Sequence, residues 1–298
     1  MRILLLFNPI SGTGRAPAVA HALLGPLRGA GHQCELVETR RGPDMAWLDQ
    51  ALSSRPDLLV VVGGDGAVRL AAGPAARAGV PLWQCPLGTE NLFAREWGMR
   101  PGAAALLRAI HHHDVVEMDL GDADGEVFVL MASAGLDAHV VHDLASRRRG
   151  GISHLSYAGP VVRALRSHRP QRLAVDVDGA RLDIEGPGFL VVANARQYAL
   201  RMDPLPRANP ADGLLDVRWF PAAGVMGVAW WSLLCMLRRQ EGHQRAVTAC
   251  GRRITVRGDQ PFLYQLDGDP PSARPVHEAV ERLEICVRRE RLRVLRGG

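Results

Sequence analysis

The first 120 residues of the chain alternate apolar runs with helical stretches, and turns containing glycine separate the two. The predicted strands cover residues 2–7, 33–38, 58–62 and 81–85, and the predicted helices cover residues 16–30, 45–53, 67–78 and 102–110. Strands that are apolar along their length are typical of a parallel sheet with helices on both faces. This alternation therefore predicts an α/β domain, and it constrains the fold more than any other feature of the sequence.

After His113 the pattern changes to short strands separated by Gly, Asp and Pro turns. Many of these strands alternate polar and apolar residues, as half-exposed antiparallel strands do. They cover residues 115–120, 127–132, 173–177, 181–184, 189–194, 214–220, 253–257, 262–266 and 282–287. We therefore expect an α/β domain over residues 1–119 and a β-sandwich domain with one or two helices over residues 120–298. The last ten or so residues are a candidate for a return to the first domain.

The composition excludes several classes of protein. The 298 residues include no lysine, so neither a phosphate-binding loop of the GxxxxGK[ST] type nor a lysine Schiff base can form. Five widely spaced cysteines without a CxxC pair favour free thiols in a reducing, cytoplasmic compartment over a zinc site or a disulfide framework. An excess of 36 arginines over 31 acidic residues indicates anionic partners, whereas an aromatic content of 5% argues against nucleic acid.

Three segments raise the question of a membrane or metal role. The run at residues 1–7 is too short for a signal peptide, so we expect a buried strand. Phe220–Leu237 carries no charge over 18 positions, but a spanning helix needs about 20 apolar residues. Because it begins Phe-Pro-Ala-Ala-Gly, we expect a helix of about 10 to 15 residues packed on the sandwich, and partial insertion into a bilayer surface stays open. We expect His111–His113 to be a solvated loop, because three adjacent side chains cannot all face one metal ion.

Glycine-containing turns follow the predicted strands and suit a phosphate ligand. Asn8–Gly14 precedes a predicted helix, whose N-terminus favours anions, although turns of this composition often only reverse the chain. Gly63–Gly66 lets the backbone approach a polyphosphate, and its Asp65 either reaches a divalent cation or caps the next helix. Pro86–Asn91 adds a hydroxyl and an amide at the same sheet edge. Turns of similar composition in the second domain are Asp212–Asp216 and Leu266–Asp269.

Taken together and in this order, the turns resemble the diacylglycerol kinase catalytic family, which includes bacterial lipid kinases, sphingosine kinases and ceramide kinases. The resemblance rests on NPISG at 8–12, GGDGA at 63–67, PLGTEN at 86–91, SAGLDA at 133–138, RRRGGISHLSYAG at 147–159, PRANPADGLLDV at 206–217 and QLDGD at 265–269. It covers essentially the whole chain. It implies a nucleotide-binding α/β domain, a β-sandwich domain and an active site in the cleft between them.

The resemblance also implies a nucleotide site, a catalytic base and two places for Mg²⁺. The ATP-binding residues would be Asn8, Pro9, Ile10, Ser11, Gly12, Thr39, Gly63, Gly64, Asp65, Gly66, Ala67, Arg69 and Thr89. Asp65 would also lie at the phosphates and their Mg²⁺, and Asp269 would take the proton from the lipid hydroxyl. A second, structural Mg²⁺ would be held by the Asp212 side chain with carbonyls near Asn209 and Leu214.

Several positions depart from the pattern of the family. The replacements are Ala67 for threonine, Arg69–Leu70 for Asn-Glu, Leu92 for aspartate, Ala199–Leu200 for a glycine-rich stretch and Asp269 for glutamate. The aspartate carboxylate lies about one methylene further back, and a misplacement near 1 Å can cost on the order of 10²-fold in rate. Arg69 would compensate in part by placing a fixed cation near the phosphates. Three outcomes stay open: the backbone compensates, the substrate binds deeper, or the enzyme is slow or inactive.

These observations lead to an expected function. We expect a cytoplasmic, ATP- and Mg²⁺-dependent kinase that phosphorylates a hydroxyl of a diacylglycerol-like or sphingoid/ceramide-like lipid at an anionic membrane. The basic run at residues 147–149, with Arg163, Arg166 and Arg169, is either a contact with that membrane or a solvated face. The alternatives are a kinase of a soluble alcohol and a lipid- or nucleotide-binding protein without catalysis. Nucleic acid is not an expected partner.

Overall fold

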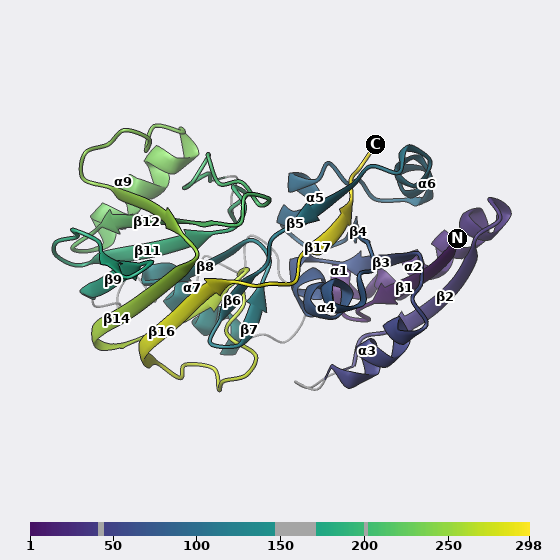
Figure 1. The fold of residues 1–298 in the computed structure, drawn as a ribbon, viewed down its shortest axis with the longest axis horizontal. Helices are drawn as coiled ribbons and strands as arrows, with labels where there is room; N and C mark the ends of the chain where they lie inside the picture. The colour runs from purple at the N-terminus through teal and green to yellow at the C-terminus, as the bar shows by residue number, and fades with distance from the viewer. Residues whose placement is uncertain (41–44, 147–170, 200–201) are drawn as a thin grey trace. The chain divides into compact units, whose positions relative to one another are not determined.

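The computed structural model describes residues 1–40, 45–146, 171–199 and 202–298, which form two compact units (Figure 1). The first unit contains Met1–Leu120 and Arg289–Gly298, and the second contains the described residues from Gly121 to Arg288. The arginine run expected at residues 147–169 lies outside the described residues.

A six-stranded sheet with the order β2-β1-β3-β4-β17-β5 forms the centre of the first unit. Its strands are β1 (Arg2–Phe7), β2 (Gln33–Glu38), β3 (Leu58–Gly63), β4 (Leu82–Pro86), β5 (Val115–Met118) and β17 (Leu292–Leu295). Neighbouring strands are parallel except β17 and β5. The expectation of a parallel sheet is therefore confirmed for four strands and wrong at one edge, where the C-terminal strand (yellow in Figure 1) pairs with β5 in the opposite direction.

Helices follow the strands of this sheet and cover both of its faces. They are α1 (Ser11–Gly14), α2 (Ala16–Gly29), α3 (Ala46–Ser53), α4 (Asp65–Ala78), α5 (Leu92–Glu96) and α6 (Ala103–His112). Helix α2 contacts α6, and α3 contacts α4. Because β1-α2-β2 and β3-α4-β4 run in opposite directions along the sheet, right-handed crossovers place α2 and α4 on opposite faces. His111–His113 are exposed, as expected, but they do not form a loop: His111 and His112 lie in the last turn of α6, and His113 ends it in a left-handed conformation with φ of 51°.

Two antiparallel sheets form the second unit, in the orders β10-β9-β14-β16-β6-β7 and β13-β12-β11-β8-β15. The first sheet contains β6 (Gly121–Ala123), β7 (Glu126–Phe128), β9 (Leu173–Val177), β10 (Ala180–Arg181), β14 (Arg253–Phe262) and β16 (Val280–Val287). The second contains β8 (Met131–Ala134), β11 (Gly188–Ala193), β12 (Leu215–Pro221), β13 (Val247–Gly251) and β15 (Tyr264–Leu266). One buried cluster takes side chains from both sheets, which confirms the expected sandwich.

Two predicted strands are each divided between the two sheets. The run at residues 127–132 becomes β7 and β8, and the run at residues 262–266 becomes the end of β14 and β15. Residues on both sides of each break are buried, so the sequence there shows no alternation that would reveal a change of sheet. The strand expected at 181–184 shrinks to the two residues of β10.

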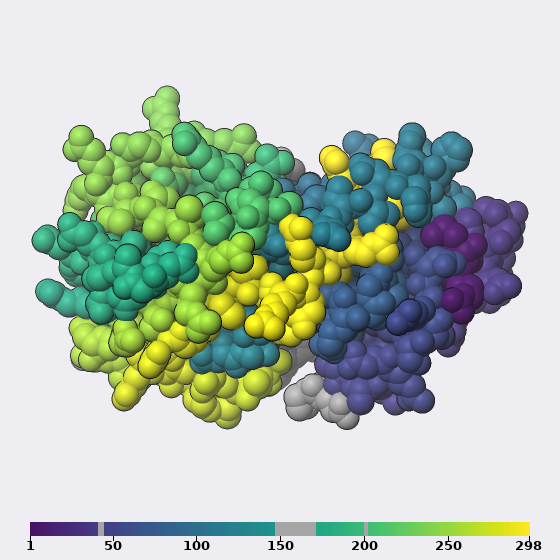
Figure 2. Space-filling model, in the orientation of Figure 1, coloured from purple at the N-terminus to yellow at the C-terminus, as the bar shows by residue number. Residues whose placement is uncertain are grey.

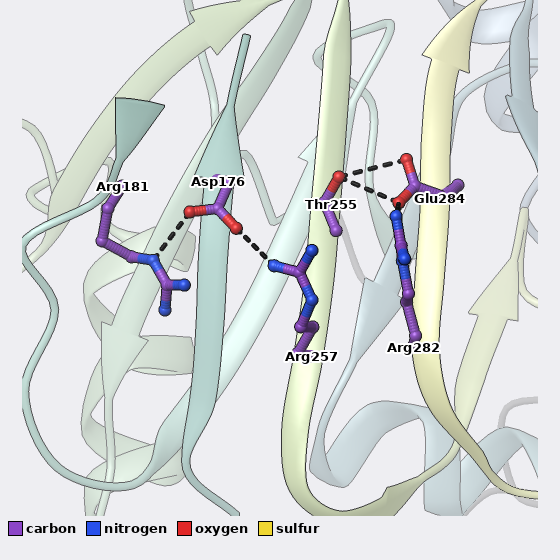
Figure 3. Close-up of polar contacts among 6 residues, drawn as sticks. All are labelled: Asp176, Arg181, Thr255, Arg257, Arg282 and Glu284. Atoms are coloured by element: carbon purple, nitrogen blue, oxygen red, sulfur yellow. Dashed lines mark hydrogen bonds and ion pairs between the residues drawn. The ribbon is translucent and has the colours of Figure 1, made fainter. Parts of the chain in front are cut away.

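The outer faces of the two sheets differ in chemistry. On the β14 sheet, Asp176 accepts hydrogen bonds from Arg181 Nε at 2.7 Å and from Arg257 Nη1 at 2.6 Å, while Thr255 donates to Glu284 at 3.0 Å (Figure 3). This face is polar, and many of its charges are paired across strands. The outer face of the other sheet is covered by α9 (Val225–Met236), a 12-residue helix.

Helix α9 confirms the expectation of a packed helix within the uncharged segment Phe220–Leu237. Trp231, Leu234 and Cys235 of this helix pack against residues of β11 and β12. Over the described ranges, no helix is both long enough and apolar enough to cross a membrane. The structure also describes helix α7 (Leu136–Ser146) in this unit, which contacts β8 and β15.

Candidate active site

The strand order of the first unit creates a switch point between β1 and β3. The chain leaves β1 toward α2 and leaves β3 toward α4, and these helices lie on opposite faces of the sheet. Open α/β sheets bind ligands at the carboxyl ends of their strands at such a switch point. The predicted ATP-binding segments Asn8–Gly12 and Gly63–Ala67 begin at this place, and Thr39 lies beside it, donating its N–H to the Phe7 carbonyl at 2.9 Å.

The glycine-rich loops that follow β1, β3 and β4 contact one another. A Cβ on Gly63 would lie 2.9 Å from Ala67 Cβ and 3.4 Å from Ser11 Oγ. A Cβ on Gly88 would lie 2.7 Å from Gly64 Cα, closer than real Cβ contacts allow. The structure therefore brings the three predicted loops together, and these glycines are needed for the loops to approach each other, whatever they bind.

The first loop is held by its own side chain and backbone groups. Asn8 Oδ1 accepts the Ile10 N–H at 3.2 Å, and the Asn8 carbonyl accepts the Ser11 N–H at 2.9 Å. Gly12 and Thr13 then take left-handed conformations with φ of 60° and 57°. Two of the amides that the sequence assigns to ATP thus already have acceptors within the loop, which gives Asn8 a structural role in its shape.

Asp65 is the first residue of α4, but its carboxylate caps a different helix. Its Oδ1 accepts the Phe93 N–H at 3.0 Å, at the N-terminus of α5. The prediction that Asp65 caps the helix that follows it, α4, is therefore wrong, because Asp65 caps α5 instead. Leu92, where the family pattern has an aspartate, begins α5 and is only 6% exposed. A leucine offers no ligand for a cation, so the chain lacks one carboxylate at this loop.

Two residues outside the predicted site fix the shape of the loops. Asn91, in a left-handed conformation with φ of 50°, accepts the Gly88 N–H at 2.7 Å and donates to the Gly88 carbonyl at 2.7 Å. This pair of bonds closes the turn that carries Thr89. Gln84, which is fully buried in β4, donates to the Gly63 carbonyl at 3.0 Å. A glutamine within an otherwise apolar strand is the sequence signal that would have pointed to it.

In the second unit, the turn at Leu266–Asp269 contains two aspartates with different surroundings. Asp267 and Gly268 both have positive φ, 51° and 85°, as in a two-residue hairpin turn of type I′. The Asp267 carboxylate is buried and accepts three backbone N–H groups, from Val129 and Leu130 at 2.7 Å and from Met131 at 2.9 Å. Asp267 therefore holds the segment between β7 and β8. Asp269, two residues later, is half-buried.

A buried chain of hydrogen bonds leads away from this turn. Gln265 accepts the Gly268 N–H at 2.7 Å and donates to Ser133 Oγ at 2.6 Å. Ser133 donates to Asp137, which also accepts the Tyr198 hydroxyl at 2.7 Å. Burial, and then the charge of Asp137, raises the pKa of Tyr198, so its proton stays on the phenol. Sequence reasoning did not assign Gln265 or Tyr198, although Gln265 lies within the QLDGD motif.

The residues expected to hold a structural Mg²⁺ form a compact turn. Asp212 Oδ1 accepts the Leu214 N–H at 3.0 Å, and Asn209 Oδ1 accepts the Ala211 N–H at 3.2 Å. Burial raises the pKa of Asp216, and the nearby charge of Asp212 adds to the effect. Among the described residues no group of three or more His, Cys, Asp or Glu side chains could hold a metal. The turn nevertheless offers carboxylate, amide and carbonyl oxygens, the donors that Mg²⁺ prefers, so the donor chemistry fits.

Comparisons with known proteins agree across both units. Residues 2–123 match the diacylglycerol kinase catalytic domain, and residues 130–289 match the YegS C-terminal NAD kinase beta sandwich-like domain. A diacylglycerol kinase of Mycobacterium tuberculosis (strain ATCC 25618 / H37Rv) is 29% identical over 223 residues, 72% of this chain and 72% of its own. A diacylglycerol kinase of Bacillus subtilis (strain 168) is 23% identical over 273 residues, 90% of this chain and 89% of its own.

A solved structure shows the same fold. The crystal structure of a diacylglycerol kinase from Bacillus anthracis str. Sterne covers 99% of this chain and 97% of its own, with a TM-score of 0.71 at 18% identity. At this identity the likeness concerns the fold alone. The two family matches together cover most of the chain, and the sandwich match alone covers more than half of it. The chain therefore belongs to the diacylglycerol kinase family of lipid kinases with a YegS-type C-terminal domain.

Proposed function

We propose that the chain is an ATP- and Mg²⁺-dependent lipid kinase that transfers the γ-phosphate to a hydroxyl of a diacylglycerol-like or sphingoid/ceramide-like lipid. The observation that carries the proposal is the contact of three glycine-rich loops at the switch point of the parallel sheet. In a member of this family, a site that suits polyphosphate supports phosphoryl transfer. A cytoplasmic chain that contacts anionic membranes at their surface is part of the same proposal.

On the nucleotide side, the loops of the first unit would bind and orient ATP. The backbone of Asn8–Gly12 and Gly63–Ala67 would surround the phosphates, with Thr39 and Thr89 at the margins. The N-terminus of the 14-residue helix α4 would add its dipole. Arg69, in the second turn of α4, would supply a fixed positive charge. Since the chain has no lysine, arginine and backbone amides must do this work.

Mg²⁺ would be held at two places. Asp65 would hold the ion that accompanies ATP, and the turn with Asn209, Asp212 and Leu214 would hold a structural ion. When bound, the first ion would neutralise part of the phosphate charge. Asp65 already accepts the Phe93 N–H through Oδ1, so the same carboxylate would fix α5 and meet the ion.

On the lipid side, Asp269 is the proposed base. It would take the proton of the lipid hydroxyl while the oxygen forms a bond to the γ-phosphorus and the bond from that phosphorus to the bridging oxygen of ADP breaks. Asp267, two residues earlier, is unsuited to this role because its carboxylate is occupied by three backbone N–H groups. That the two units form one active site stays a prediction of the family resemblance.

The test is transfer of labelled γ-phosphate from ATP-Mg²⁺ to lipids in mixed micelles. Diacylglycerol, monoacylglycerol, sphingosine, ceramide and phosphatidylglycerol would be compared with a water-soluble alcohol. We expect one lipid to be labelled, and Asp269→Asn to lower kcat by about 100-fold or more. Asp259→Asn, which changes an exposed aspartate of β14, is the matched control and should keep full activity. A wild-type rate in Asp269→Asn, or a preference for the soluble alcohol, would contradict the proposal.

The replacement of an expected aspartate by the buried Leu92 supports a second candidate, a protein that binds nucleotide or lipid without transfer. Titration calorimetry with ATP-Mg²⁺ distinguishes the two. Binding without turnover in the wild type, and also in Asp269→Glu, would favour the binding protein. A gain of kcat in Asp269→Glu, on the order of 10²-fold, would show instead that the shorter carboxylate limits a working kinase.

A further inference from the structure

Helix α9 of the second unit is apolar around its whole circumference. One face packs on the sandwich, where Trp231 contacts Phe220 with 5.2 Å between ring centroids and donates its indole N–H to the Pro221 carbonyl at 2.8 Å. This buried face accounts for Trp231, Leu234 and Cys235. Packing on the sandwich therefore explains these residues and the partly buried Val228, but not the other apolar residues of the helix, which are exposed.

The opposite face of α9 exposes large apolar side chains. Met226 is 80% exposed, Trp230 53%, Leu233 48%, Met236 57% and Leu237 56%. Met226, Trp230, Leu233 and Leu237 follow one another at spacings of four, three and four residues, so they form one stripe. These residues, with Met236, are called the α9 stripe below. The segment that contains helix α9 is light green in Figure 2. An exposed apolar stripe of this kind marks an interaction site.

Arginines border the C-terminal end of the α9 stripe. Arg238 and Arg239 follow Leu237, the residue that ends the stripe, and Arg207 reaches the same loop by pairing with Glu241 at 3.1 Å. Arg238 lies 3.9 Å from Asp203. Arg239 and Arg245, both in the segment between α9 and β13, are exposed and form no ion pair with any residue that the structure describes. The border of the stripe is therefore positively charged.

The outer face of the β14 sheet and the α9 stripe differ in chemistry, and this difference indicates what the stripe binds. The outer face of the β14 sheet meets water, and its arginines are paired with Asp176 and Glu284 (Figure 3). The α9 stripe has no such pairs and presents Trp230 with unpaired arginines at its end. Apolar residues with tryptophan and a cationic border are the composition of helices that lie in a membrane interface.

We infer that the α9 stripe docks on an anionic membrane surface, with its apolar side chains in the boundary between headgroups and acyl chains. Its 12 residues extend about 18 Å, well short of the roughly 30 Å of a bilayer core, so the helix lies in the plane of the surface. Arg239 and Arg245 would then meet anionic headgroups. The inference rests on the proposed lipid kinase only in that a lipid substrate brings the chain to a membrane.

The test is binding to sedimented vesicles, measured without ATP or acceptor lipid. Vesicles of phosphatidylcholine mixed with phosphatidylserine, an anionic lipid outside the acceptor panel, are compared with vesicles of phosphatidylcholine alone. The double variant Trp230→Ser/Leu233→Ser should bind the mixed vesicles at least about 10-fold more weakly. Arg239→Gln/Arg245→Gln should weaken binding by about 5-fold per arginine on the mixed vesicles and leave binding to pure phosphatidylcholine unchanged. Val276→Ser, at a residue 43% exposed elsewhere in the unit, is the matched control.

Each outcome of this test is decisive. Failure of the wild type to bind mixed vesicles, or wild-type binding by Trp230→Ser/Leu233→Ser, overturns the inference. So does a wild-type dimer in analytical ultracentrifugation that the same variant loses, because the stripe would then pair two copies of the chain. Vesicle binding by a chain with no kinase activity would refute the proposed function and leave the docking surface intact. Thermal unfolding of the variants should match the wild type, since the changed side chains are exposed.

Discussion

At the scale of single residues, the turn at Leu266–Asp269 shows how two identical side chains come to differ. Both aspartates belong to the same four-residue turn, and composition or spacing cannot rank them. Their tertiary contacts distinguish them, because the carboxylate of Asp267 accepts backbone N–H groups 136 to 138 positions away in sequence. Asp269 was assigned to catalysis by family resemblance alone. The occupied carboxylate of Asp267 adds a physical reason to look to its neighbour.

Asp267→Ala should destabilise the second unit. It leaves the N–H groups of Val129, Leu130 and Met131 buried without their acceptor, so we expect the free energy of unfolding to fall by at least about 2 kcal/mol. Urea unfolding followed by circular dichroism measures the change. Asp269→Ala is the companion variant and should lose about 1 kcal/mol or less, because this side chain is only half-buried. Equal losses in the two variants would refute the division of roles.

At the scale of elements, the strands and helices of the first unit follow from their hydrophobic pattern almost residue by residue. Strands β1 and β2 begin and end where the sequence predicts, and α2 and α4 differ by only one or two residues at an end. Helix α5 was missed because its five residues are too short to show a helical period. Its N-terminus depends instead on Asp65, a residue 28 positions earlier. A local pattern cannot report such a cap.

The cap gives Asp65 two roles that substitution can separate. Asp65→Ala removes the acceptor of the Phe93 N–H, so the free energy of unfolding should fall by about 1 kcal/mol. Asp65→Asn keeps a side-chain oxygen and should recover most of that stability, but it removes the charge proposed for Mg²⁺. We therefore expect phosphoryl transfer to stay low in both variants. Urea unfolding measures the stability, and the micelle assay measures phosphoryl transfer. If Asp65→Asn recovered both, Asp65 would have the capping role only.

At the scale of the whole molecule, the last strand of the chain returns to the sheet of the first unit. Strand β17 lies between β4 and β5, and Arg291 ties it to β5 through Glu117 at 3.1 Å and Asp119 at 2.9 Å. The sequence marked the final residues as a candidate for return, yet it did not predict a strand there. A strand of four residues with arginines on either side is too short to show an alternation of polar and apolar residues. The residues of β5 that it contacts lie more than 170 positions earlier in the sequence.

The position of β17 predicts that a change near the C-terminus affects the unit that contains the N-terminus. Leu292 is fully buried in this strand, so Leu292→Ala should lower the free energy of unfolding of the first unit by about 2 to 5 kcal/mol. Arg293→Ala, at the exposed neighbouring position, is the matched control and should change it by less than about 1 kcal/mol.

Hydrogen exchange followed by mass spectrometry locates the effect of Leu292→Ala. Amides of β1, β3 and β4 should lose protection, because these strands share a continuous sheet with β17. Since the loops that follow these strands form the proposed nucleotide site, ATP binding should weaken in the same variant. Unchanged protection in β1 and β3 would mean that β17 does not stabilise these strands. The proposed nucleotide site would then not depend on β17.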